Sequence, residues 1–213
     1  PLPDFHLDKL QRQAVRQALS RLATSPAEQH TEADQVQWHM LQSNCLACHV
    51  RSRQGGIGPK RRRYFETAAH VDLGDEGRIP PPLDGVGAKL TGEWLKKVFE
   101  GSGDVRPHMR ARMPKFSAGS TASLPGWLAA ADGHRPRTAV AVFGKTAGLA
   151  EPGRTLTDTG CVQCHPVRGE RLPGVVGIDL AGTANRIHPD WMRRFLFDPA
   201  SLKRGTRMPT FFP

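Results

Sequence analysis

Apolar residues at helical spacing mark the start of the chain. From Asp8 to Leu22, leucine, valine and alanine recur every three or four residues, while three arginines fall on another face. This periodicity predicts an amphipathic helix. A polar stretch containing proline follows, from Thr24 to Thr31, and we expect it to be a linker.

The same spacing predicts four further helices, over residues 34–43, 92–100, 123–132 and 190–197. Trp38 and Leu41 form the expected core face of the first of these helices. Thr91 and Pro189 are residue types that commonly open helices, and they precede the second and the fourth. We expect the helix over residues 123–132 to pack on the helix over residues 34–43. These elements favour an all-α fold.

The apolar pattern of the first half returns in the second. Trp191 follows Trp94 by 97 residues, and Gly182 follows Gly85 by the same 97. A second matched element, Arg-Met-Pro-x-Phe, occurs at Arg112 to Phe116 and returns 95 residues later. A fixed offset of this kind indicates the duplication of one structural unit.

All four cysteines of the chain belong to two short motifs, Cys45-Leu46-Ala47-Cys48-His49 and Cys161-Val162-Gln163-Cys164-His165. Cys-x-x-Cys-His is the attachment motif of c-type haem, in which both thiols bond the porphyrin and the histidine binds the iron. A dithiol redox pair or half of a zinc site is the alternative, and it leaves both histidines unexplained. The motifs therefore predict two covalent haems, held by Cys45, Cys48, Cys161 and Cys164, with His49 and His165 on the iron.

The repeated Arg-Met-Pro-x-Phe element supplies a candidate second iron ligand in each half. A thioether is a neutral, soft ligand, and the proline after it stiffens the loop that carries it. We therefore predict that Met113 and Met208 bind iron. His108 and Met109 are alternatives in the first half. His188 is the alternative in the second half, although its place before a helix-opening proline suggests a cap.

A proline-rich loop in the first half, and its counterpart in the second, complete each predicted haem pocket. We expect a main-chain carbonyl near Pro81, or near Ile178 in the second half, to accept the Nδ1 proton of the adjacent iron-binding histidine. The leucines should contact the haem, the tryptophans should pack at its edge, and the arginines of the methionine elements lie either over its propionates or in solvent. These predicted pocket residues are Pro81, Leu83, Trp94, Arg112, Leu180, Trp191 and Arg207.

With these ligands in place, both halves resemble class I c-type cytochromes, over about Asp34 to Asp132 and Thr155 to Pro213. The resemblance implies two small α-helical domains, each built around one haem with histidine and methionine on the iron. Two departures stand out. The first half has 19 extra residues between His49 and Gly85, and the second half has no closing helix after its methionine. The helix over residues 8–22 is the obvious candidate to replace it.

The start of the chain also resembles part of a cytochrome domain, because Leu2-Pro3-Asp4-Phe5 resembles the later methionine element with leucine in place of methionine. Residues 1–31 are either an ordinary N-terminal helix with its linker or the tail of a preceding cytochrome-like domain. The predicted organisation continues with a first cytochrome c domain over residues 32–134, a linker over 135–154 and a second cytochrome c domain over 155–213. A turn of helix near Phe143 to Thr146 is expected within the linker region.

The charge of the chain bears on its partners. Thirty basic and twenty acidic residues give a formal net charge of +10, and six basic residues fall between Arg51 and Arg63. This run is either a solvated loop or a docking surface for an acidic redox partner. Aromatic residues are not interleaved with the basic ones, which disfavours nucleic-acid binding. No apolar run is long enough to predict a transmembrane helix.

Two bound ligands leave an iron no open position, so the predicted function is electron transfer, as a carrier or as a relay within a larger redox system or polypeptide. No catalytic residues are predicted. The alternative is a dihaem peroxidase or another haem oxidoreductase in which one iron can lose a ligand. Covalent haem attachment implies a periplasmic or otherwise extracytoplasmic location.

Overall fold

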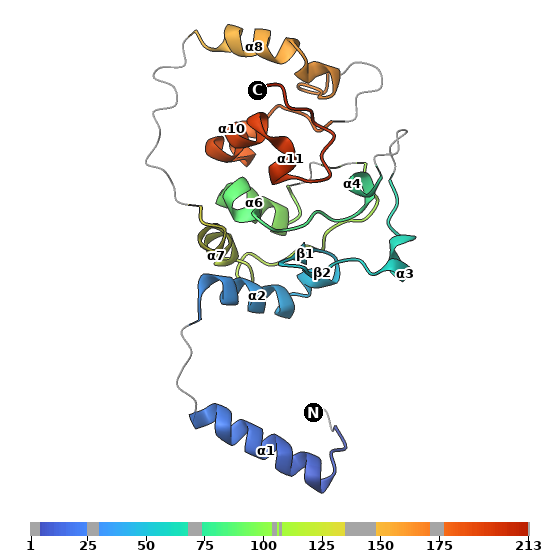
Figure 1. Cartoon of the computed structure of the whole chain (residues 1–213), viewed down its shortest axis with the longest axis vertical. Helices are drawn as coiled ribbons and strands as arrows, with labels where there is room; N and C mark the ends of the chain where they lie inside the picture. The colour runs from blue at the N-terminus through green and yellow to red at the C-terminus, as the bar shows by residue number, and fades with distance from the viewer. Residues whose placement is uncertain are drawn as a thin grey trace. The chain divides into compact units, whose positions relative to one another are not determined.

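The computed structural model describes residues 5–24, 30–67, 74–103, 106, 108–134, 148–170 and 177–212. The chain forms two compact units, Pro1–His30 and Thr31–Pro213. Helices dominate the described residues, which also contain one two-stranded sheet, so the expectation of an all-α chain is confirmed at this coarse level (Figure 1). Within the described part of the chain, no helix has both the length and the apolar character needed to cross a membrane.

The first unit contains helix α1, Lys9–Thr24, where the apolar pattern predicts a helix. Asp8 opens it, because the Asp8 carboxylate accepts a hydrogen bond from the Gln11 amide at 2.8 Å and the Gln11 side chain accepts one from the Asp8 amide at 2.9 Å. Four apolar side chains of α1 are exposed, namely Leu10, Val15, Leu19 and Leu22. The proposal that α1 replaces the missing closing helix stays a prediction.

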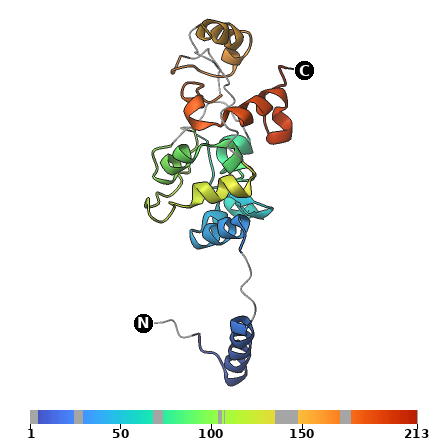
Figure 2. The same ribbon diagram turned by 90° about the vertical axis from the view of Figure 1, so that its left-hand side faces the viewer.

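The core of the second unit lies where helix α2, Glu32–Gln42, packs on helix α7, Leu124–Ala131 (Figure 1, Figure 2). Both helices and their packing were expected. The expected core face of α2 is wrong, because Trp38 and Leu41 are exposed while Val36 and Met40 are almost fully buried. Val36 and Met40 lie one helical turn apart, whereas Trp38 lies two residues from each and so projects from the opposite side.

A short helix, α5, Val86–Lys89, crosses α7 so closely that only glycine fits between them. A Cβ atom placed on Gly87 would lie 2.2 Å from the carbonyl carbon of Leu128. The corresponding residue of the second half is Ala184, which is exposed in helix α9, Thr183–Arg186. The second half therefore lacks the residue that allows a closing helix to pack as α7 does.

A buried ion pair ties the parts of the first half together. Arg51 contacts the Asp132 carboxylate at 2.6 Å, and their side chains are only 10% and 7% exposed. Arg51 also donates to the Leu83 carbonyl at 2.6 Å, and Asp132 accepts from the Gly87 amide at 2.7 Å. Arg51 is thus a structural residue, which removes it from the predicted solvated basic run. Its counterpart in the second half, two residues after the histidine, is Val167.

The two-stranded sheet pairs β1, Val50–Arg51, with β2, Gln54–Gly55. Ser52 and Arg53 between the strands have φ angles of 51° and 64°, the left-handed values that a tight two-residue hairpin turn requires. Val167 and Glu170 form the same turn in the second half, where Arg168 and Gly169 also have positive φ. The repeat is therefore intact up to this hairpin.

The 19 extra residues of the first half must then lie between the hairpin and Pro81, and we call this segment the insertion. Its described parts contain helix α3, Pro59–Arg62, and helix α4, Asp75–Arg78. Both helices occur where the sequence predicts only loop and irregular structure. Four-residue helices carry too little periodicity to be recognised from the sequence.

The described residues of the rest of the unit contain four further helices: α6, Gly92–Phe99; α8, Ala150–Asp158; α10, Pro189–Phe197; and α11, Pro199–Leu202. The predicted linker over residues 135–154 is wrong at its C-terminal end, because α8 begins at Ala150. This helix is rich in threonine and contains Pro152 and Gly153, so its weak helix propensity hid it. The turn expected near Phe143 lies outside the described residues.

The close packing of α5 on α7 predicts opposite effects for two glycines of the first half. Replacing Gly87 with Ala should lower the free energy of unfolding by roughly 1–3 kcal/mol, because the added methyl group overlaps the Leu128 backbone. Replacing Gly126 with Ala, at an exposed position of α7 with open space around it, should raise the free energy of unfolding by about 0.5–1 kcal/mol. Denaturant unfolding followed by circular dichroism distinguishes the two. Equal losses for both variants would contradict this packing.

Candidate functional site

The two Cys-x-x-Cys-His motifs adopt the same local structure. Each begins with a short 3₁₀ turn, Cys45–Ala47 in the first half and Cys161–Gln163 in the second. In both, the amide of the histidine donates to the carbonyl of the first cysteine at 2.9 Å. A helix precedes each turn, α2 in the first half and α8 in the second, and all four thiols are free of disulfide bonds.

Each histidine of the motifs is held by a backbone carbonyl. His49 Nδ1 lies 2.7 Å from the Pro81 carbonyl, and His165 Nδ1 lies 2.8 Å from the Ile178 carbonyl. A carbonyl can only accept, so the proton resides on Nδ1 and the lone pair of Nε2 is free to bind a metal. Burial lowers the pKa of His49, which favours the neutral, ligating form of the ring. Both expected hydrogen bonds are present.

The loops that supply these carbonyls are fixed in the same way in both halves. The Leu83 amide donates to the Val50 carbonyl at 2.8 Å, and the Leu180 amide donates to the Pro166 carbonyl at 2.9 Å. The replacement of proline by Ile178 therefore leaves the contact in place. In the second half Gly177 lies so close to the motif that an added Cβ would meet the Cys164 carbonyl oxygen at 2.2 Å.

The structure places Met113 at the edge of the first core. Its partly buried side chain packs against the α2–α7 core, as do Cys45, Leu46 and Leu83. The predicted attachment cysteine, pocket leucine and ligand methionine of the first half thus border one apolar cluster. Met208 is also partly buried, in the loop that follows α11.

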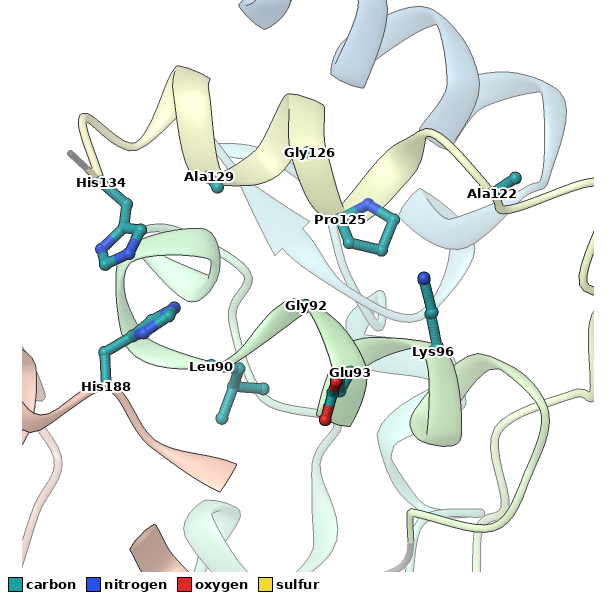
Figure 3. Close-up of a pocket in the computed structure, with 10 residues that line it drawn as sticks. All are labelled: Leu90, Gly92, Glu93, Lys96, Ala122, Pro125, Gly126, Ala129, His134 and His188. Atoms are coloured by element: carbon teal, nitrogen blue, oxygen red, sulfur yellow. The ribbon is translucent and has the colours of Figure 1, made fainter. Parts of the chain in front are cut away.

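The alternative ligands have other contacts. Met109 is buried and forms a β-bridge with Thr67, whose hydroxyl donates to the His108 carbonyl at 3.2 Å. His188 begins α10 as its cap residue but makes no side-chain capping bond. Its ring stacks on that of His134 instead, with centroids 3.8 Å apart, at one end of an open hollow of about 420 Å³ (Figure 3).

The two halves meet through an approximately twofold contact that the sequence did not predict. Leu90 and Ile187 occupy equivalent positions 97 residues apart, and they pair in an antiparallel bridge. The flanking hydrogen bonds are equivalent too, since the Thr91 amide donates to the Arg186 carbonyl at 3.0 Å and the His188 amide donates to the Lys89 carbonyl at 2.9 Å. Equivalent residues thus contact one another across the interface, as in a symmetric dimer.

The repeated tryptophans lie at this interface, each beneath a cation from the other half. Lys89 Nζ lies 4.7 Å from the ring centre of Trp191, and the Arg186 guanidinium lies 6.0 Å from that of Trp94. Lys89 and Arg186 are again equivalent positions. Their shared place at the end of α5 and of α9 is the signal that the sequence offered and that pattern reasoning missed.

Positive charge accumulates at the same interface. Arg186 is buried, and burial together with Lys203, Arg106 and Arg186 lowers the pKa of Lys89 to about 8. Among the described residues, the carboxylate of Glu76 opposes this shift. Such a site favours an anionic group.

Arg112 and Arg207, the arginines of the methionine elements, are both exposed. The Arg112 side chain donates to the Met109 carbonyl, so it is hydrogen-bonded to the backbone of its own loop. Their predicted contact with propionates stays a prediction.

The donor set of each half fits a c-type haem. Two unpaired thiols and one Nε2 lone pair come from a single turn, and a thioether lies on a separate loop. Among the described residues, no group of three or more His, Cys, Asp and Glu side chains is placed to hold a metal ion directly.

Comparisons with models of protein families, with curated proteins and with solved structures found no match to this chain. The candidate sites therefore stand on the motifs and on the geometry described above.

Proposed function

We propose that this protein transfers electrons through two covalently attached haems, with His49 and Met113 on one iron and His165 and Met208 on the other. The observation that carries the proposal is the duplicated arrangement of a Cys-x-x-Cys-His turn whose histidine donates Nδ1–H to a backbone carbonyl, at 2.7 Å and at 2.8 Å. In this reading the two halves of Thr31–Pro213 are tandem cytochrome c domains.

A bound haem iron would supply a one-electron redox couple. The residues of the chain would hold the haem and set its reduction potential. The cysteines would hold each porphyrin, and the carbonyl hydrogen bond orients each imidazole and makes it a better donor to iron. Met113 and Met208 would each bind iron as a second ligand, and a methionine ligand raises the reduction potential of a haem. An iron closed on both sides suits electron transfer and disfavours substrate binding.

The interface between the halves suits a relay. Lys89 and Arg186 lie there at equivalent positions, each beside a tryptophan of the other half, and they would neutralise haem propionates. Two haems on either side of this interface would exchange electrons with each other as well as with partners. A periplasmic or otherwise extracytoplasmic location and a place in a larger redox system or polypeptide belong to the same proposal.

The basic residues of α3 favour an acidic redox partner. Lys60, Arg61 and Arg63 are exposed, and Arg61 donates to the carbonyl of Ala47, inside the first attachment turn, at 3.4 Å. The positive surface thus adjoins the point where the first haem would be attached. Arg62 is engaged with Asp75 at 2.8 Å and contributes less.

Absorption spectra of the purified protein test the ligand assignment. We expect two haems per chain in the pyridine haemochrome assay, low-spin spectra, and a far-red sulfur-to-iron band in the oxidised protein with the amplitude of two methionine ligands. Replacing Met113 or Met208 with Ala should each remove about half of that band, since each variant opens one iron. High-spin bands in the unaltered protein, together with peroxide turnover, would favour the peroxidase alternative.

The partly buried cation Lys89 at the interface predicts a change in reduction potential. Replacing Lys89 with Met should lower the potential of at least one haem by roughly 60 mV, about tenfold in the one-electron equilibrium, because a nearby positive charge favours the less positive ferrous state. The exposed Lys96→Met variant is the control and should shift the potential far less. Spectroelectrochemical titration measures both, and equal shifts would remove Lys89 from the haem environment.

Charge reversal at Arg61 in α3 and at Arg63, the residue that follows α3, tests the docking surface. The double variant Arg61→Glu, Arg63→Glu should slow electron exchange with an acidic partner protein about tenfold or more at low ionic strength, with the difference shrinking at high salt. Stopped-flow mixing measures this rate. Reversal at Arg154 and Arg193, which lie in the second half, serves as the matched control, and a loss of the same size there would point to net charge and not to this surface.

A further inference from the structure

The insertion contacts the loop that carries the first candidate methionine ligand. The Arg110 amide donates to the Glu66 carbonyl at 3.2 Å, and Thr67 forms a β-bridge with Met109. These contacts are made mainly by the backbone, three and four residues before Met113. The Glu66 and Arg110 side chains also pair, at 3.6 Å, but both are more than 60% exposed. Screening by water leaves such a pair little effect on stability.

The other end of the insertion reaches the second half of the chain. Glu76, in α4, forms an ion pair with Lys203, the residue that follows α11. The two side chains are 34% and 29% exposed, so this pair is considerably less hydrated than the pair of Glu66 and Arg110. Gly205 lies against the same carboxylate, since an added Cβ would be 2.9 Å from Glu76 Oε1.

Hydrogen bonds lead from Lys203 to the second candidate methionine ligand. The Lys203 carbonyl accepts from the Thr206 amide at 2.9 Å, which closes a turn. The Thr206 hydroxyl then accepts from the Met208 amide at 3.2 Å. The position of the Met208 backbone therefore depends on the turn that begins at Lys203, and Glu76 anchors this turn from the first half.

The two methionine loops differ in what else supports them. The loop of Met113 is tied to α6 by the Phe116 amide, which donates to the Phe99 carbonyl at 2.8 Å, and the Met113 side chain packs on the α2–α7 core. The loop of Met208 is supported after the methionine by Phe211, whose ring lies against Gly160, and by Phe212, whose ring centre lies 5.9 Å from that of Phe197. The contact with the insertion acts on the other side of the methionine, at the turn that precedes Met208.

We propose that the insertion of the first half holds the iron-ligand loop of the second, with Glu76 as the positioning residue for Met208 through its ion pair with Lys203. This inference rests on the proposed function, in which Met208 binds iron. Glu76 touches neither the haem nor the iron. It keeps the Lys203–Thr206 turn in the conformation that presents Met208, so that the sixth ligand of one haem depends on a segment of the other cytochrome-like half.

The test compares variants of the haem-loaded, full chain. Glu76→Gln and Lys203→Gln should each shift the equilibrium between bound and detached Met208 by roughly fivefold towards detachment. Each should therefore lower the midpoint pH at which the far-red sulfur-to-iron band is lost. In the reduced protein, the upfield-shifted methyl signals of the two bound methionines report each haem separately, once Met113→Ala and Met208→Ala have assigned them. The signal of Met208 should weaken or broaden while that of Met113 stays unchanged.

Two further variants make the result specific. The exchange Glu76→Lys with Lys203→Glu should restore the midpoint pH, because it rebuilds the ion pair with its charges reversed. Glu66→Gln removes the exposed pair on the same insertion and should leave both methionine signals unchanged.

The possible outcomes separate the two proposals. An unaltered protein with neither a far-red band nor shifted methyl signals would overturn methionine ligation itself, and the positioning role with it. Two intact methionine signals that Glu76→Gln leaves unchanged would overturn only the positioning role. Equal loss of both signals, or no rescue by the exchange, would show that Glu76 acts on general stability and would likewise overturn it.

Discussion

The hydrogen bond between each motif histidine and a backbone carbonyl is the contact on which the rest of the structure depends. It joins the attachment turn to the following loop, at His49 and Pro81 in one half and at His165 and Ile178 in the other. The bond assigns the proton to Nδ1 and leaves the Nε2 lone pair available for a metal. Because the acceptor is a backbone carbonyl, the bond survives the change from proline to isoleucine, and the site tolerates divergence of the side chains around it.

Duplication of this unit also explains the interface between the halves. Equivalent residues, Leu90 and Ile187, pair across it, and their neighbours exchange equivalent hydrogen bonds. A contact made by the same surface on both copies arises directly when two identical units associate, as in a symmetric dimer. The same symmetry brings Lys89 and Arg186 together, so the positive charge of the interface is a consequence of the repeat.

The halves have diverged where the first has a closing helix. Gly87 and Arg51 both serve contacts with α7 and its C-terminal Asp132, and the second half has Ala184 and Val167 in their places. A helix that covered the second half would therefore need contacts other than those made by Gly87 and Arg51. The methionine loop of the second half is contacted by the insertion, where Glu76 pairs with Lys203. The extra residues of the first half thus contact the methionine loop of the second.

The sequence by itself determined the local features: the two Cys-x-x-Cys-His motifs, the repeat, most of the longer helices and the loops that supply the carbonyls. These depend on residue types at short, fixed spacings, which the chain displays directly. The tertiary structure decided which face of α2 is buried, that α8 is a helix in spite of weak propensity, that Arg51 pairs with Asp132, and that the insertion reaches Lys203. Each of these depends on contacts between residues far apart in the chain. Burial and ion pairing are properties of such neighbours in space, so no local pattern could reveal them.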